Sequence, residues 1–156
     1  MGSRKIQIGL LGAAVAIAIA IVTGVASASS DITSPTTIHV QLRGGRSTFI
    51  DTGKTGPSPG DRIVLNQPAY FASDLSKQVG TGVVTITLIG GANETQDDAT
   101  LVLPGGQIVV EGIQGSGKSF TLAVTGGTGA YQNARGQVHV SLQPHNVSNV
   151  TANLIP

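Results

Sequence analysis

The sequence predicts an all-β domain, either a barrel or a sandwich, behind a short N-terminal export segment. Two observations lead to this prediction. After the first 35 residues, short runs rich in Val, Ile and Thr alternate with turns rich in Gly, Pro and Asp. Outside the N-terminal segment, no stretch repeats its apolar residues with a helical period. About eight short strands at this spacing are typical of both folds, and closure into a barrel would remove the exposed edges of a chain full of β-formers.

Eight runs of β-forming residues are the expected strands. They are Thr37–Leu42, Arg62–Ala69, Val79–Leu88, Thr100–Leu103, Gln107–Gln114, Ser119–Thr125, Gln137–Leu142 and Val147–Leu154. One contiguous core, or its two faces, is expected from residues of the middle strands, namely Leu101, Leu103, Ile108, Val110, Phe120, Leu122 and Val124. The segment Arg43–Gly60 is long and rich in Gly, Pro and Ser, so we expect a lid or a disordered excursion there.

The N-terminus has the layout of a secretory signal peptide. A basic pair, Arg4-Lys5, precedes the apolar run Ile8–Val22. Small residues follow, with Ala26 and Ala28 at the positions before a cleavage site. The other interpretation is an uncleaved membrane anchor, for which the apolar run is at the short limit. We therefore expect a signal peptide that ends at residue 28, and a secreted protein.

Cleavage would leave a leader at residues 29–35 and one domain at residues 36–156. The full chain has 9 basic and 8 acidic residues, so losing Arg4 and Lys5 leaves 7 basic residues against 8 acidic ones. No basic stripe remains, which argues against nucleic acid as a partner. The chain has no cysteine, so it can form neither a disulfide nor a zinc–thiolate site. His139 and His145 lack a second ligand at metal-binding spacing, so we expect neither a metal nor another cofactor.

One motif matches a nucleotide-binding pattern by chance. Gly112–Ser119 fits the phosphate-loop pattern letter for letter. Phosphate binding there needs a helix directly after the loop, so that the amides of the helix N-terminus face the phosphates. The next residues, Phe120–Thr125, are a β-run instead, so we interpret the segment as a hairpin turn and expect no nucleotide.

Four glycine-containing motifs occur along the chain, and their order and spacing indicate a family resemblance. They are Gly60-Asp61, Ser73–Gly80, Gly106–Gly112 and Thr125–Val138, the last containing the triplet Ala134-Arg135-Gly136. In this order and spacing they resemble the allene oxide cyclase and dirigent superfamily of small β-barrels. The resemblance spans roughly Thr36 to Leu154. It implies a single eight-stranded antiparallel β-barrel that binds a small apolar ligand, and it favours a homo-oligomer, a dimer or a trimer.

The resemblance also implies site residues on the first strand. Thr37, His39, Gln41 and Arg43 share one face of that strand. In allene oxide cyclases the matching strand projects an acid and an amide into the cavity, and His39 and Gln41 occupy those places. His39 would then act as a general acid or base near neutral pH. The alternative is a solvated outer face.

Further candidates follow from the same resemblance. Leu65 stands near an aromatic pocket position of the cyclases, and Asn66 or Gln67 near their pocket amide. Arg135 matches the arginine of the dirigent Ala-Arg-Gly motif, with Tyr131 beside it; the alternative for Arg135 is a salt bridge at the barrel end. Glu111 would be a proton donor if it pointed inward, and a solvated carboxylate if it pointed outward.

Three function classes follow from these residues. The first is a cofactor-independent cyclase or isomerase, the second a dirigent-like barrel that binds and orients a ligand, and the third a structural cell-surface barrel without a pocket. Convergent polar groups in an open cavity would favour the first class. An open apolar cavity would favour the second, and a filled barrel the third.

Overall fold

The computed structural model describes residues 34–90 and 94–156, and in these it is entirely β-structure. The expected signal peptide and residues 29–33 of the leader lie outside the described residues. No helix long and apolar enough to cross a bilayer occurs in the described part of the chain.

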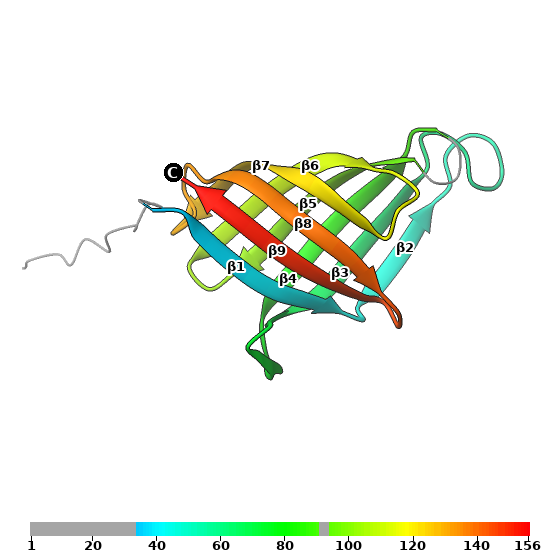
Figure 1. Cartoon of the computed structure of the whole chain (residues 1–156). Helices are drawn as coiled ribbons and strands as arrows, with labels where there is room; N and C mark the ends of the chain where they lie inside the picture. The colour runs from blue at the N-terminus through cyan, green and yellow to red at the C-terminus, as the bar shows by residue number, and fades with distance from the viewer. Residues whose placement is uncertain (1–33, 91–93) are drawn as a thin grey trace, which may run out of the picture.

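Nine antiparallel strands form one continuous sheet. They are β1 (Thr36–Arg43), β2 (Arg46–Ile50), β3 (Arg62–Phe71), β4 (Asp74–Leu88), β5 (Thr95–Leu103), β6 (Gly106–Gln114), β7 (Ser119–Gly129), β8 (Arg135–Gln143) and β9 (Val147–Ile155). The order β1-β9-β8-β7-β6-β5-β4-β3 closes on itself because β1 also pairs with β3. The predicted eight-stranded antiparallel barrel is thus confirmed, with β2 as one additional strand (Figure 1).

The segment Arg43–Gly60 contains a strand, contrary to the expectation of a lid or a disordered excursion throughout. β1 pairs with β9 along its whole length, up to Arg43 opposite Val147. The chain then turns through Gly44 and Gly45, which both have positive φ, and continues as β2 along β3. Within the described residues β2 pairs with β3 alone. The sequence allows this because Ser-Thr-Phe-Ile is a short β-forming run between two glycine turns.

The loop between β2 and β3 is fastened by Asp61, a fully buried carboxylate. Its Oδ1 accepts hydrogen bonds from the backbone N–H and the hydroxyl of Thr52, and its Oδ2 accepts the corresponding pair from Ser58. The backbone N–H of Thr52 contributes most to holding the pKa of Asp61 below 3.8. The Gly60-Asp61 motif therefore anchors a loop at the end of the barrel where β2 diverges from β1.

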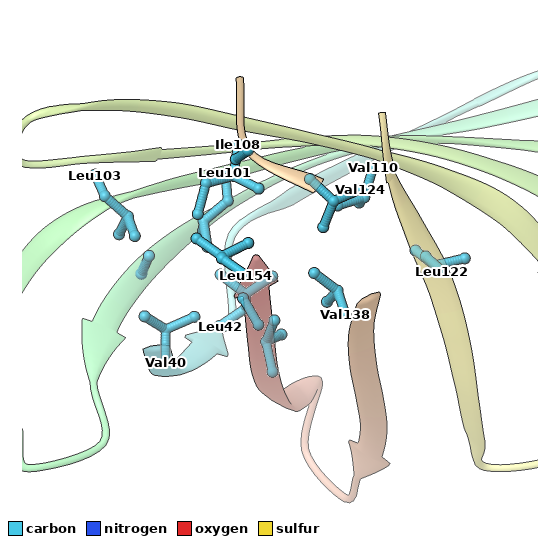
Figure 2. Packing of buried hydrophobic residues seen from close by; sticks show 14 residues of the cluster. Val40, Leu42, Leu101, Leu103, Ile108, Val110, Leu122, Val124, Val138 and Leu154 are labelled. Carbon is cyan, nitrogen blue, oxygen red and sulfur yellow. The ribbon is translucent and has the colours of Figure 1, made fainter. Parts of the chain in front are cut away.

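Alternation along the strands gives the barrel an apolar interior. One buried cluster contains six of the seven residues predicted for the core, and the seventh, Phe120, is partly buried and packs against it. The cluster fills the barrel from the end at which Leu154 pairs with Thr36 and Leu103 with Gly106, as far as Leu42, Val110 and Leu122, which also border the cavity described below. Figure 2 shows the labelled side chains of β1, β5, β6 and β9 turned toward one another there.

Two glycine-rich segments differ from, or refine, what the sequence indicated. Gly126, Gly127 and Gly129 belong to the end of β7, beyond the predicted strand end at Thr125, and the turn to β8 follows at residues 130–133. Gly127 is required by close approach, because a Cβ at this position would lie 2.2 Å from the carbonyl oxygen of Tyr131. The Gly112–Ser119 motif spans the β6–β7 hairpin, and a strand follows it rather than a helix.

Gly45→Ala should destabilise the barrel far more than Gly53→Ala. The two glycines have nearly the same φ, +93° and +91°, so both substitutions carry backbone strain of about 1 kcal/mol or more. A Cβ at Gly45 would also lie 2.2 Å from the carbonyl oxygen of Asn66, whereas nothing lies within 4 Å at Gly53. Urea unfolding should show an extra loss of at least about 2 kcal/mol for Gly45→Ala. Equal losses in the free energy of unfolding would contradict the close approach of Gly45, in the kink between β1 and β2, to Asn66 of β3.

Candidate functional site

The barrel is hollow at the end where β2 diverges. A cavity of about 90 Å³ lies there, between the packed cluster and the end formed by the β2–β3 loop and the β6–β7 and β8–β9 hairpins. Because one water molecule needs about 10–15 Å³ of cavity volume, the cavity takes roughly six waters or more, or one small organic ring. Its wall is mostly aliphatic and includes Leu65, Val84, Ile86, Val110, Leu122 and Val140.

Few polar side chains border this space. They include Asp97 on β5, Gln67 on β3, Gln114 on β6 and Ser148 on β9. Gln67 is 3 % exposed, and its Nε2 donates a hydrogen bond to the carbonyl oxygen of Gly44 at 3.0 Å. The Gln67 amide thus supports the kink between β1 and β2 as well as forming part of the wall.

Asp97 is the acidic group of the cavity. Its side chain is 2 % exposed and lies on the inward face of β5, between its cross-strand partners Ile86 and Gly112. Thr95, two residues earlier on the same face, donates a hydroxyl hydrogen bond of 2.8 Å to Asp97 Oδ1. Gly112 has no side chain, and Leu122 covers its position: a Cβ at Gly112 would lie 3.0 Å from Leu122 Cδ2.

Burial raises the pKa of the Asp97 carboxyl above 3.8. The hydroxyl of Thr95 opposes this change by bonding to the ionised form, and the negative charge of Asp98 next in the chain adds to it. Asp98 itself is exposed on the outer face. The cavity therefore favours the neutral, protonated form of Asp97 more than water does.

A row of inward-facing positions leads from Asp97 on β5 to β2, the strand that diverges from β1. The register places Phe49, Ile63, Ile86, Asp97 and Gly112 opposite one another in succession from β2 to β6. Residues directly opposite in antiparallel strands share a face, so these positions all belong to the inner side of the sheet. Phe49 remains 47 % exposed. The apolar inner surface thus extends beyond the cavity, onto β2.

Two of the residues predicted to contact a ligand border the cavity, and one does not. Leu65 and Gln67 both form part of its wall. Tyr131 lies at the packed end instead, where it leans on the core cluster and its hydroxyl donates to the carbonyl oxygen of Pro104 at 3.3 Å. Burial raises the pKa of Tyr131 above 10.0.

The four residues proposed as catalytic all have exposed or partly exposed outer positions and do not border the cavity. His39 and Gln41 alternate on β1 with the inward Val40 and Leu42, so they face away from the interior. His39 lies 3.2 Å from the hydroxyl of Thr151, and Gln41 donates to Asn149. The polar face of β1 is therefore the outer surface, as in the alternative weighed from the sequence.

Glu111 and Arg135 also lie outside the barrel. Glu111 is exposed on β6, opposite Ala123 on the neighbouring strand. The guanidinium of Arg135 donates to the backbone oxygen of Pro156, so it joins the start of β8 to the chain end. The expectation that either side chain reaches a molecule inside the barrel is not met, because both follow the outward parity of their strands.

Asp97 was missed from the sequence because the strand prediction began at Thr100. Aspartate is a poor strand former, so the predicted strand did not extend back to Asp97 and Asp98. A signal was nevertheless present. Asp97 has the same parity as the predicted core residues Leu101 and Leu103, and extending the strand toward its start would have turned Asp97 inward.

Several solved structures share this barrel. A pyocyanin demethylase is 24 % identical over 76 % of this chain and 99 % of its own, with a TM-score of 0.65. The pterocarpan synthase dirigent protein PsPTS1 is 18 % identical over 78 % of this chain and 94 % of its own, with a TM-score of 0.62. The chain has the dirigent-type barrel fold. AbnU, an exo-specific intermolecular Diels-Alderase, has the same TM-score of 0.62 at 16 % identity, over 78 % of this chain and 98 % of its own.

These likenesses confirm the resemblance that the motifs indicated. They do so at the level of the fold, since the identities are low. The sequence by itself matches no protein-family model and no curated protein. Within residues 34–90 and 94–156, no group of three His, Asp or Glu side chains is placed to hold a metal ion.

The dirigent-type barrel holds two buried aspartates whose substitutions should respond to pH with opposite signs. Below about pH 3.8 the Asp97 carboxyl is protonated in both the folded and the unfolded state. As the pH rises further, the unfolded state ionises first, so the wild type loses stability relative to Asp97→Asn until the folded pKa is passed. Asp61→Asn should do the reverse: the lowered pKa of Asp61 stabilises the wild type above about pH 3.8, and this advantage shrinks as the pH falls through the folded pKa.

Urea unfolding of the wild type and both variants between about pH 3 and pH 7 measures these trends. Parallel pH profiles for Asp97→Asn and Asp61→Asn would show that the two carboxyls do not differ in this way.

Proposed function

We propose that this protein binds a small apolar molecule inside the barrel and holds it in a defined orientation, as a dirigent-like barrel. The observation that carries the proposal is the hollow end of the barrel, walled by aliphatic side chains and bordered by few polar groups. Apolar cavities with a small number of placed polar groups are typical of ligand sites. A structural barrel without a pocket would be expected to fill this end as it fills the other.

The arrangement also suits a second candidate, a cofactor-independent cyclase or isomerase. One observation favours it: the cavity contains a buried carboxyl that can donate a proton or a hydrogen bond. In such an enzyme the wall would fold a reactive chain or bring two reacting groups together, and the exclusion of water would strengthen the polar contact. The residues that do this would be Asp97 and the wall around it.

The named neighbours support both candidates through their fold. One is called a dirigent protein, one a demethylase and one a Diels-Alderase. A barrel of this shape therefore occurs both in dirigent proteins and in enzymes. We further propose that the protein acts outside the cell, which rests on the sequence of residues 1–28, and that it forms a homo-oligomer, which rests on the family resemblance.

Filling the cavity should abolish binding without unfolding the barrel. Ala99 borders the cavity on β5, so Ala99→Leu would place three additional carbons in the space a ligand needs. Ala123→Leu is the matched control, because Ala123 is exposed on the outer face of β7. With α-methylstyrene as the probe, NMR titration should show at least about tenfold weaker binding to Ala99→Leu and unchanged binding to Ala123→Leu.

The free energies of unfolding of both variants should lie within about 1.5 kcal/mol of the wild-type value. Ala99→Leu fills an existing cavity and so avoids most of the strain of overpacking, and Ala123→Leu adds its carbons on the outer face. Failure of the folded wild-type protein to bind the probe would refute the proposed ligand site. Equal binding by the wild type and Ala99→Leu would place the binding elsewhere on the protein.

A further inference from the structure

We propose that Asp97 selects the ligand: the cavity takes a neutral molecule with an apolar body and one acceptor oxygen, such as a carbonyl, and the protonated carboxyl of Asp97 donates a hydrogen bond to that oxygen. This inference rests on the proposed function, because it names the class of molecule that the same cavity binds. It is argued from the surroundings of Asp97, from the shape of the wall and from the charges near it.

The surroundings of Asp97 offer it little hydrogen bonding. The carboxyl is 2 % exposed, and Thr95 donates to its Oδ1. Its cross-strand partners, Ile86 and Gly112, have no side-chain polar atoms. A buried carboxyl with one hydroxyl donor and an aliphatic wall is poorly suited to carry a charge. In its protonated form, one oxygen accepts from Thr95 while the other has a proton to donate.

The wall provides a place for the ligand beside this proton. On the Gly112 side of the carboxyl, the side chain of Leu122 covers the wall. On the other side, Ile86, Ile63 and Phe49 continue the same row, with neighbouring strands about 4.8 Å apart. A ring or short chain lying along this row would cover the isoleucines and would reach the carboxyl with one end.

The charges near Asp97 favour a neutral ligand over a cationic one. Asp97 is the one titratable side chain among the residues that border the cavity, within the described part of the chain. The nearest carboxylates on its own strand and on β6, Asp98 and Glu111, are exposed on the outer face. Burial raises the pKa of Asp97, and the negative charge of Asp98 adds to this effect, so both favour the protonated form. An amine ligand would require the ionised form that these surroundings disfavour.

Three probes of nearly equal size separate the possibilities. Acetophenone carries a carbonyl, α-methylstyrene replaces that oxygen with a methylene group, and 1-phenylethylamine is a cation. NMR titration of the full chain at a pH below the pKa of Asp97 should show acetophenone bound roughly three- to tenfold more tightly than α-methylstyrene. This preference should decline as the pH rises through the pKa of Asp97, because the ionised carboxylate repels the carbonyl oxygen.

Two variants assign the preference to Asp97. In Asp97→Leu, acetophenone and α-methylstyrene should bind equally well. In Asp97→Asn, whose amide also donates, the preference should persist at every pH tested. Asp98→Asn is the matched control on the outer face: it should keep the preference and move its decline to a lower pH. If Asp97→Leu does not fold, the pH dependence in the wild type and its loss in Asp97→Asn still decide the question.

The outcomes distinguish the two proposals. Failure of every probe to bind removes the proposed function and this inference with it. Equal binding of acetophenone and α-methylstyrene to the wild type keeps the proposed function and overturns the assignment of Asp97. Tightest binding by 1-phenylethylamine, increasing as the pH rises, would show that Asp97 is an ionised partner for cations and would equally overturn it.

Discussion

The kink at Gly44 and Gly45, between β1 and β2, determines where the sheet closes and where it stays open. The first strand pairs with β9 on one side and, over its last residues, with β3 on the other. At Gly44 and Gly45 the chain leaves β9 and follows β3 alone as β2. The carbonyl oxygen of Gly44 accepts hydrogen bonds from the side-chain amides of Gln67 and Asn146, so β3 and the β8–β9 hairpin both hold the kink. Beyond this point the strands diverge, and the hollow end of the barrel begins.

The strict alternation of strand side chains then sorts the polar residues into two groups. Most of them, including His39, Gln41 and Glu111, face outward and pair with each other or with solvent. Few face inward, and among the described residues that border the cavity only Asp97 can change its charge. An inward carboxyl that carries a charge lowers the stability of the fold unless it is paired or fully hydrogen-bonded. This cost is the physical reason for treating Asp97 as functional rather than as part of the packing.

The sequence predicted the fold well because β-propensity, alternation and glycine turns are local signals. All eight barrel strands and the seven core residues could be located from them. The site was harder to predict, because its residues depend on which face of each strand turns inward. For β1 the resemblance suggested that the polar face lines the cavity, whereas the buried positions are Val40 and Leu42. Comparing each strand position with the predicted core residues would have corrected the assignment of faces. Val40 and Leu42 form the apolar face of β1, and Asp97 shares the face of Leu101 on β5.

The central claim is that the end of the barrel around Asp97 is an empty apolar space that a small molecule can enter. Crystals of the protein under xenon pressure test this claim directly, since xenon enters apolar cavities without needing hydrogen bonds. The account predicts xenon density among Ile86, Val110 and Leu122. A barrel that takes up no xenon there, with side chains packed across the space, would contradict it.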